Sequence, residues 1–200
     1  MGKGNRLGFM LSAALMCVAL LASTAAAQNS NSSTTGMGVG TGQTATVSSS
    51  DRKFAMTAAA GGMAEVETAR LALTKASSDS VRQYAQKMID DHTAANAELM
   101  QIASAKGITL PSAPDAKHRA MMAKMERLSG AAFDREYIMM AGSKDHQKME
   151  KLFRDESTRG RDADLKAFAA KTLPVVQMHL QMARDVHGSM SGMKGMDHSK

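Results

Sequence analysis

The sequence predicts an all-α fold: an antiparallel up-down four-helix bundle with a short extra helix between long helices two and three. Three observations lead to this prediction. Apolar residues recur at helical spacing over about residues 51–187, turn signals divide this region into long segments, and no segment shows the alternating pattern of a strand. Because the connections between the long segments are short, successive helices should lie antiparallel.

The first 27 residues have the form of a cleavable signal peptide, and we exclude them from the fold. Lys3 and Arg6 precede the apolar run 7–22, and three alanines then end the segment at Ala27. The apolar run is shorter than the roughly 20 residues that a membrane anchor needs. We therefore expect cleavage after Ala27, no membrane span, and a mature protein that is periplasmic or secreted.

Composition excludes several classes of protein. The only cysteine, Cys17, lies in the signal segment, so the mature chain has no disulfide and no thiol nucleophile. The chain has 25 Lys and Arg against 19 Asp and Glu, and two of the basic residues belong to the signal segment. The remaining charges are interspersed and the chain has no Trp, so nothing indicates nucleic-acid binding.

Low-complexity segments flank the folded region. Residues 28–50 are almost entirely Ser, Thr, Gly, Asn and Ala, a composition that predicts a disordered linker. Residues 188–200 form a tail rich in Gly, Met, Ser, His and Lys, without helical periodicity, and predict disorder as well. The bundle domain is therefore expected at residues 51–187.

The first two long helices and the short helix are predicted from their end signals. Asp51 is the expected N-cap of a helix that runs to about residue 76, and residues 77–79 connect it to a second helix ending near Gly107. A proline-rich loop follows at residues 110–114. Asp115 then caps the short helix, which reaches about residue 128.

The third and fourth long helices follow a break at Gly130. The third is expected over about residues 131–158. Asp162 opens the fourth, which runs to about Gly188. Pro174 lies within the fourth helix, where it removes one backbone hydrogen bond and should kink the helix.

Each long helix carries one ionisable residue near its middle, on or beside the apolar face. In the first helix this residue is Glu65, in the second His92 and in the fourth His179. In the third helix Asp145 and His146 flank the apolar face, and we favour His146 as the inward residue. Mid-helix positions of an antiparallel bundle meet at one level, and bundle cores build metal sites in this way.

Counting residues from the connections tests whether these side chains share a level. Glu65 and His92 differ by about two residues, roughly 3 Å at a rise of about 1.5 Å per residue. His146 and His179 differ by about five residues, roughly 7–8 Å, and would share a level only if the kink at Pro174 shifts the register.

Two interpretations of these residues stay open. A Glu65–His92 ion pair within a structural polar cluster would satisfy the buried carboxylate without any metal. Alternatively, Glu65, His92, His146 and His179 together would suit a single Zn, Cu or Fe ion. A di-iron carboxylate centre is disfavoured because it needs Glu three residues before His on two helices. The positions three residues before the histidines hold Ile89, Ser143 and Val176.

The tail offers a second candidate metal site. Met190, Met193 and Met196 recur every three residues, and His198 follows. Thioether and imidazole ligands suit the soft ions Cu(I) and Ag(I). A methionine-rich tail could equally scavenge oxidants, since methionine sulfoxide is repairable.

The mature sequence lacks the common signatures of an enzyme, including a G-x-S-x-G elbow and a phosphate-binding glycine loop. Three function classes therefore compete. The first is a non-enzymatic periplasmic bundle of envelope or stress physiology that binds one metal ion in its core. The second is a copper- or silver-binding protein acting through its tail. The third is a structural or partner-binding bundle without metal, whose partner is an envelope protein or a second copy of the chain.

Several stretches of the folded region form a recognisable pattern. They are Asp51-Arg-Lys-Phe54, Gly61-Gly-Met-Ala-Glu65-Val, Met88-Ile-Asp-Asp-His92, Phe133-Asp-Arg-Glu-Tyr137, and His146, Ala169 to Pro174 and His179. This pattern resembles the domain-of-unknown-function family numbered 4142. The resemblance covers about residues 51–187 and implies a ferritin-like four-helix bundle exported to the bacterial periplasm or outer surface. It also implies that the four ionisable core residues are part of the family pattern, and it implies no established activity.

Overall fold

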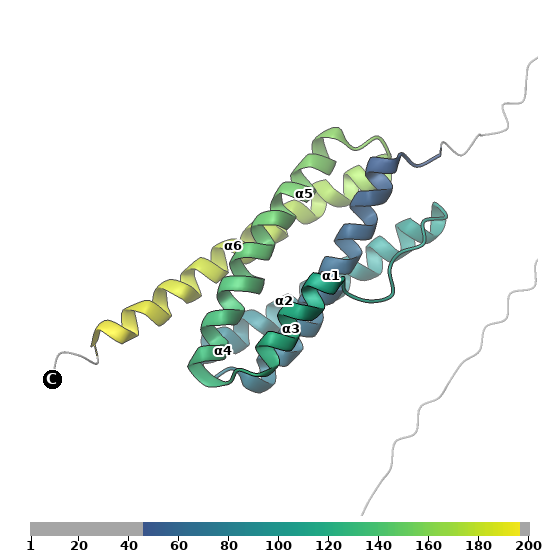
Figure 1. Cartoon of the computed structure of the whole chain (residues 1–200). Helices are drawn as coiled ribbons and strands as arrows, with labels where there is room; N and C mark the ends of the chain where they lie inside the picture. Colours follow the sequence, from purple (N-terminus) through teal and green to yellow (C-terminus); the bar gives the residue numbers. More distant parts are fainter. Residues whose placement is uncertain (1–45, 197–200) are drawn as a thin grey trace, which may run out of the picture. The chain divides into compact units, whose positions relative to one another are not determined.

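The computed structural model describes residues 46–196, with side chains up to residue 192, and all regular structure in that range is helical. The predicted all-α class is thus confirmed. The predicted signal peptide, most of the predicted linker and residues 197–200 lie outside the described range. In chain order the elements are α1 (Ser49–Lys75), α2 (Asp79–Ala105), α3 (Ala116–Glu126), α4 (Gly130–Tyr137), the π-helix η1 (Ile138–Asp145), α5 (His146–Arg159) and α6 (Ala163–Met196) (Figure 1).

The first helix begins slightly earlier than the sequence predicts. The Ser48 hydroxyl accepts a hydrogen bond from the Asp51 backbone N–H at 3.2 Å, so Ser48 is the N-cap of α1. The prediction that Asp51 is the N-cap is therefore wrong. The buried Asp51 carboxylate instead accepts hydrogen bonds from the backbone N–H groups of Arg161 and Asp162, at 3.3 and 2.9 Å. These hydrogen bonds hold the connection between α5 and α6 against the start of α1.

Helices α1 and α2 pack along each other and are joined by residues 76–78. The Asp134 carboxylate, from α4, holds this connection by accepting hydrogen bonds from the backbone N–H groups of Ser77 and Ser78, at 3.1 and 3.0 Å. The predicted glycine signal at the end of α2 is present. Gly107 has a φ of 62°, a left-handed conformation that glycine adopts without steric strain.

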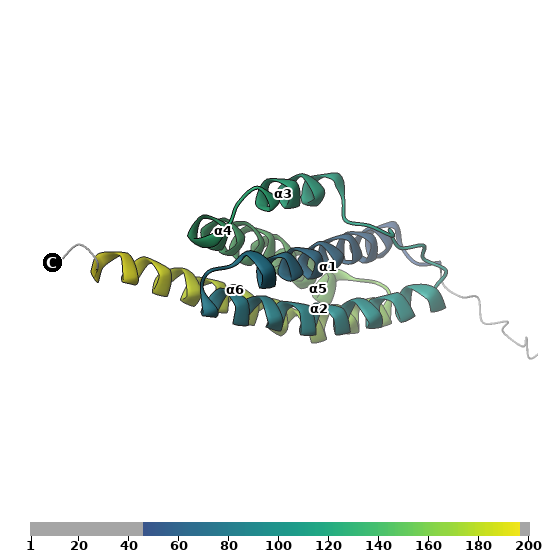
Figure 2. The ribbon, with the colours of Figure 1, turned by 90° about the horizontal axis from the view of Figure 1, so that it is seen from below.

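The predicted short helix is α3, and the Asp115 carboxylate caps it by accepting a hydrogen bond from the His118 backbone N–H at 2.9 Å. Helix α3 contacts α1 and α4 and lies on the outside of the long helices (Figure 2). Met125 is its one fully buried residue and anchors it to the core.

The third predicted helix is a continuous helical path with a π-helical segment in its middle. Helix α4 leads directly into η1, and α5 follows at His146. A π-helix closes hydrogen bonds from residue i to residue i+5, so the apolar pattern loses its regular α-helical period in this segment. This explains why the sequence leaves the inward face unresolved between Asp145 and His146. Both side chains are in fact buried, with 6% and 0% of their surface exposed.

Helix α6 contains Pro174, as predicted, and extends to Met196 rather than ending near Gly188. Gly188 lies inside the helix, whereas Gly107, which follows the end of α2, has the positive φ typical of a helix C-terminus. The half-buried Met190 packs against the core, which favours helix continuation beyond Gly188. Residues 188–196 are therefore helical, and not the disordered tail that the sequence predicts. None of the helices between residues 46 and 196 is long and apolar enough to cross a membrane.

The core divides into two apolar clusters. One, the phenylalanine cluster, surrounds Phe54, Phe153 and Phe168, whose ring centroids lie 5.2 to 6.3 Å apart. The other, the tyrosine cluster, surrounds Tyr84 and Tyr137, whose ring centroids lie 5.9 Å apart.

A layer of polar side chains separates the two clusters. Along α2, for example, His92 lies between Met88 of the tyrosine cluster and Leu99 of the phenylalanine cluster. The same order holds on the other long helices. Glu65 lies between Ala59 and Ala69, His146 between Ala141 and Met149, and His179 between Val176 and Ala183.

Candidate metal centre

The structure brings the four predicted core residues to one level. Glu65 from α1, His92 from α2, His146 from α5 and His179 from α6 are all buried, and His146 and His179 have no exposed surface. The ring centroids of His146 and His179 lie 5.4 Å apart, closer than residue counting along straight helices suggests.

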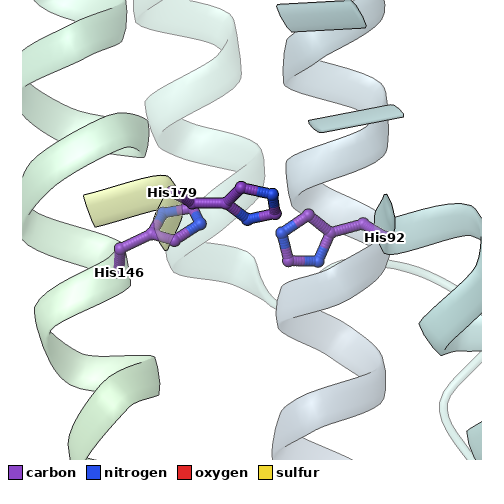
Figure 3. A group of neighbouring side chains, drawn as sticks. All are labelled: His92, His146 and His179. Atoms are coloured by element: carbon purple, nitrogen blue, oxygen red, sulfur yellow. The ribbon is translucent and has the colours of Figure 1, made fainter. Parts of the chain in front are cut away.

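The three imidazole rings form a nearly equilateral triangle. The centroid of His92 lies 5.7 Å from that of His146 and 5.1 Å from that of His179. Each ring offers one nitrogen to a common space, and these three nitrogens all lie within 4.8 Å of one another. Figure 3 shows the three rings converging from separate helices. An ion equidistant from three atoms at that limiting separation would lie about 2.8 Å from each, so a small inward shift would reach the ~2.0–2.1 Å typical of Zn–N bonds.

One nitrogen of each ring faces an acceptor outside the triangle. His92 Nδ1 lies 3.0 Å from Glu65 Oε2. His146 Nδ1 donates to the Ala141 carbonyl at 2.9 Å and lies 3.5 Å from Glu65 Oε1. His179 Nε2 donates to Asp91 Oδ2 at 2.7 Å. A carbonyl or carboxylate oxygen can only accept, so these contacts fix the protons on the outward-facing nitrogens.

The other nitrogen of each ring is left without a partner. His92 Nε2, His146 Nε2 and His179 Nδ1 are buried and find no hydrogen-bond partner anywhere in the part of the chain that the structure describes. A histidine that binds a metal through one nitrogen typically donates its other N–H to a carboxylate or backbone carbonyl, which orients the ring and raises its basicity. His146 and His179 have this arrangement, and His92 approaches it, since its Nδ1 atom lies 3.0 Å from the Glu65 carboxylate.

Glu65 lies behind the rings of His92 and His146. Its carboxylate approaches the Nδ1 atoms of both, and it is not part of the group whose ligand atoms converge. The sequence analysis treats Glu65 as a fourth ligand. The geometry instead gives Glu65 the role of an outer partner that orients two of the three histidines.

Electrostatics support a cation at this position. Burial raises the pKa of Glu65, but the charges of the surrounding histidines and its contact with His92 outweigh burial and lower the pKa to about 2. Burial lowers the pKa of His92, but Glu65 outweighs it, so the net shift is upward. Burial, followed by the charges of the other two histidines, lowers the pKa of His179 to about 4, and burial also lowers that of His146. Without a metal, Glu65 thus favours the protonated form of His92, whereas burial favours the neutral form of the other two rings.

Asp91 is a site residue that the sequence analysis does not identify. It lies outside the apolar stripe of α2 and is half-buried, and it reaches His179 of α6 from behind while also bonding Lys87 at 2.7 Å. The sequence feature that could have identified Asp91 is its position next to His92. Adjacent residues differ by about 100° around a helix, so a residue beside an inward-facing one can reach the neighbouring helix.

The predicted tail ligands do not join this centre within the described range. Met190 packs against the tyrosine cluster. Met193 and Met196 belong to α6, but only their backbone is described, and His198 lies outside the described residues.

Comparison with known protein families identifies the family of this chain. Residues 37–186 match the family described as Domain of unknown function (DUF4142). The chain belongs to this family. No curated protein and no solved structure matches the chain. The DUF4142 match confirms the resemblance seen in the sequence. It includes all three histidines together with Glu65 and Asp91, and it ends before Met190, so the core site lies in the shared domain and the tail lies outside it.

Proposed function

We propose that this DUF4142 protein binds one divalent transition-metal ion through His92, His146 and His179. The observation that carries the proposal is the set of three buried ring nitrogens that converge without hydrogen-bond partners. Buried polar atoms are normally paired, because an unpaired one costs about 1–3 kcal/mol. A shared cation would satisfy all three at once.

A purely structural polar cluster explains the site less well. Such a cluster would gain stability by pairing the histidines with each other or with Glu65 and Asp91 at both ring nitrogens. Instead the two carboxylates contact only the outward-facing nitrogens, and the inward-facing nitrogens of three rings face one another. Even when His92 is protonated, only one of the three inward nitrogens can donate, and the other two stay acceptors that a bound cation would satisfy.

The donor set favours particular ions. Imidazole nitrogens suit Zn, Cu, Fe and Ni, and among the described residues no carboxylate joins the converging group. Among the ions that the sequence analysis names, the affinity order places Cu²⁺ and Zn²⁺ above Fe²⁺ for a nitrogen site of this kind. We therefore propose Zn²⁺ or Cu²⁺ as the resident ion.

We further propose that the long helices form an antiparallel, ferritin-like bundle in which α4, η1 and α5 together count as one helix. The contacts between the long helices support this topology because they form a closed ring: α1 contacts α2, α2 contacts α6, α6 contacts α5, and α5 contacts α1. Residues 1–27 support export to the periplasm. There the protein would act by binding rather than catalysis, in envelope or stress physiology.

Elemental analysis of the protein purified from the periplasm, without chelators or a histidine tag, tests the proposal. We expect about one Zn or Cu per chain and none in a variant that combines His92→Ala with His179→Ala. His187→Ala, at an exposed position of α6, is the matched control and should keep the ion. Absence of stoichiometric metal from the unmodified protein, after reconstitution with either ion, would leave the structural polar cluster as the better explanation.

A further inference from the structure

The bundle is incompletely filled one helical turn away from the histidines. A cavity of about 20 Å³ lies there, and His92 forms part of its wall. The rest of the wall includes residues one turn from each site residue on its own helix. These are Gly62, Ala95, Asn96, Met149 and Val176.

Small side chains account for the empty space. Ala58 and Gly62 on α1 and Ala95 on α2 contribute little volume to this layer. A Cβ atom on Gly62 would lie only 2.1 Å from Asn96 Oδ1, so glycine at this position lets the Asn96 amide reach toward the bundle axis. The cavity is thus built from specific residues on α1 and α2.

The size and lining of the cavity suit one water molecule. A buried water needs roughly 10–15 Å³ of accessible space and two to four polar partners. The cavity has about 20 Å³, and His92, Asn96 and Thr172 supply polar side chains to its wall. Phe153 and Phe168 of the phenylalanine cluster also line the cavity, and its volume leaves no room for a larger ligand.

We infer that the metal centre has an exchangeable coordination position that opens into this cavity, holds one water or hydroxide, and accepts only ligands of one or two heavy atoms. The inference rests on the proposed metal site. Three protein ligands with an open fourth position are typical of reactive metal sites, whereas structural zinc sites are closed by four protein ligands. Because Glu65 lies behind the rings, no fourth His, Asp or Glu in the described part of the chain joins the converging group.

The local charges agree with a solvent ligand. Asp91 is paired with Lys87 and Asp145 with Lys148, so among the described carboxylates beside the three histidines it is Glu65 that no lysine balances. A bound hydroxide would neutralise the remaining charge, and bound water loses its proton more readily on a metal ion.

Asn96 provides a route to the cavity. It lines both the cavity and a surface groove of about 590 Å³ that also includes Met63 and Met100. Movement of this one half-buried side chain would connect the cavity to solvent.

The test uses the purified protein loaded with Co²⁺, whose visible absorption reports the ligands of the ion, and compares cyanide with imidazole. We expect cyanide to change the spectrum and imidazole to leave it unchanged, with cobalt content verified after each titration. Ala95→Val fills the cavity and should weaken cyanide binding by roughly tenfold or more, because packed cores resist added methyl groups. Ala94→Val is the matched control, since Ala94 is exposed on the same helix, and should bind cyanide normally.

The outcomes separate this inference from the proposed function. If the protein binds no cobalt, the metal site itself fails. If it binds cobalt but cyanide leaves the spectrum unchanged, or imidazole binds as readily as cyanide, the metal site stands and the exchangeable position is overturned. The comparison of the two ligands needs no substitution, so it decides the question even if Ala95→Val does not fold.

Discussion

His179 of α6 donates through Nε2 to the Asp91 carboxylate of α2 at 2.7 Å, which leaves its Nδ1 atom facing the other two histidines. This bond selects the tautomer of His179 that can bind a metal through Nδ1. It also ties α6 to α2 at the level of the proposed site. In the proposed site Asp91 would therefore act through His179 and would not contact the ion.

Asp91→Asn should weaken binding of Zn²⁺ by about 10- to 100-fold, the usual effect of losing the outer carboxylate of a histidine ligand. The amide preserves the shape of the side chain but removes the charge that makes His179 more basic. Competition titration with a chromogenic chelator measures the change. Asp90→Asn is the control, because Asp90 is exposed and bonds Gln86. Equal affinities of the two variants would argue against a role for Asp91.

Glu65→Gln should destabilise the metal-free protein by about 3–5 kcal/mol at pH 6, the cost of breaking a buried ion pair. The folded pKa of Glu65 is lowered to about 2 from 4.5, so its stabilising effect is present above pH 4.5 and is lost as the pH falls toward 2. Urea unfolding at several pH values measures both effects. The control is Glu67→Gln, at an exposed position of α1, which should change the free energy of unfolding little. A similar small change for Glu65→Gln would mean that the carboxylate is not paired.

Metal binding at pH 6 should release about one proton per ion, and that proton should come from His92. The pKa of His92 is raised, whereas burial lowers the pKa values of His146 and His179, so we expect His92 to be the main carrier of a proton before binding. The affinity should accordingly fall as the pH decreases through the folded pKa of His92. Calorimetry in buffers of different ionisation enthalpy counts the protons. Glu65→Gln should lower the count, since it removes the charge that raises the pKa of His92, and an unchanged count would contradict this assignment.

Glu156, near the end of α5, should make the protein less stable as the pH rises from about 4.5 to 7. Burial and then the charges of Asp51 and Asp162 raise its pKa from 4.5 to about 7, so the folded state holds a proton that the unfolded state has already lost. Glu156→Gln cannot ionise, and it should flatten this part of the stability curve and make the protein more stable than wild type at pH 8. Thermal unfolding across this range measures the effect. Glu126→Gln, at an exposed position of α3, should keep the slope of the wild type, and a wild-type slope in Glu156→Gln would locate the titrating group elsewhere.

The sequence predicts the helical class, the long helices and the ionisable residue at the middle of each, because these follow from local periodicity and end signals. It does not predict that His146 and His179 lie at the same level of the bundle. His146 lies about one turn closer to the connection between α5 and α6 than His179 does. Side chains lean toward the N-terminus of their own helix, so in an antiparallel pair they lean toward each other's level and compensate for this offset. Residue counting alone omits that lean.

The remaining differences arise from interactions between distant parts of the chain. The hydrogen bonds of Asp51 to the start of α6 join residues more than 100 positions apart, and no local pattern indicates them. The contact between Asp91 and His179 joins residues 88 positions apart. The π-helix before His146 interrupts the α-helical period, so periodicity could not assign an inward face there.

Truncation separates the core site from the methionine-rich end of α6. A chain that ends after residue 192 keeps Met190, and we expect it to bind one divalent ion with unchanged affinity. A chain that ends after His187 loses the packing of Met190 against the tyrosine cluster, so its free energy of unfolding should fall by about 1 kcal/mol, while its metal stoichiometry stays the same. Elemental analysis and urea unfolding of both chains test this. If the longer truncated chain loses the divalent ion, the ion is bound by the tail and not by the three histidines. If it loses only its affinity for Cu(I), the tail binds soft metal ions independently of the three histidines.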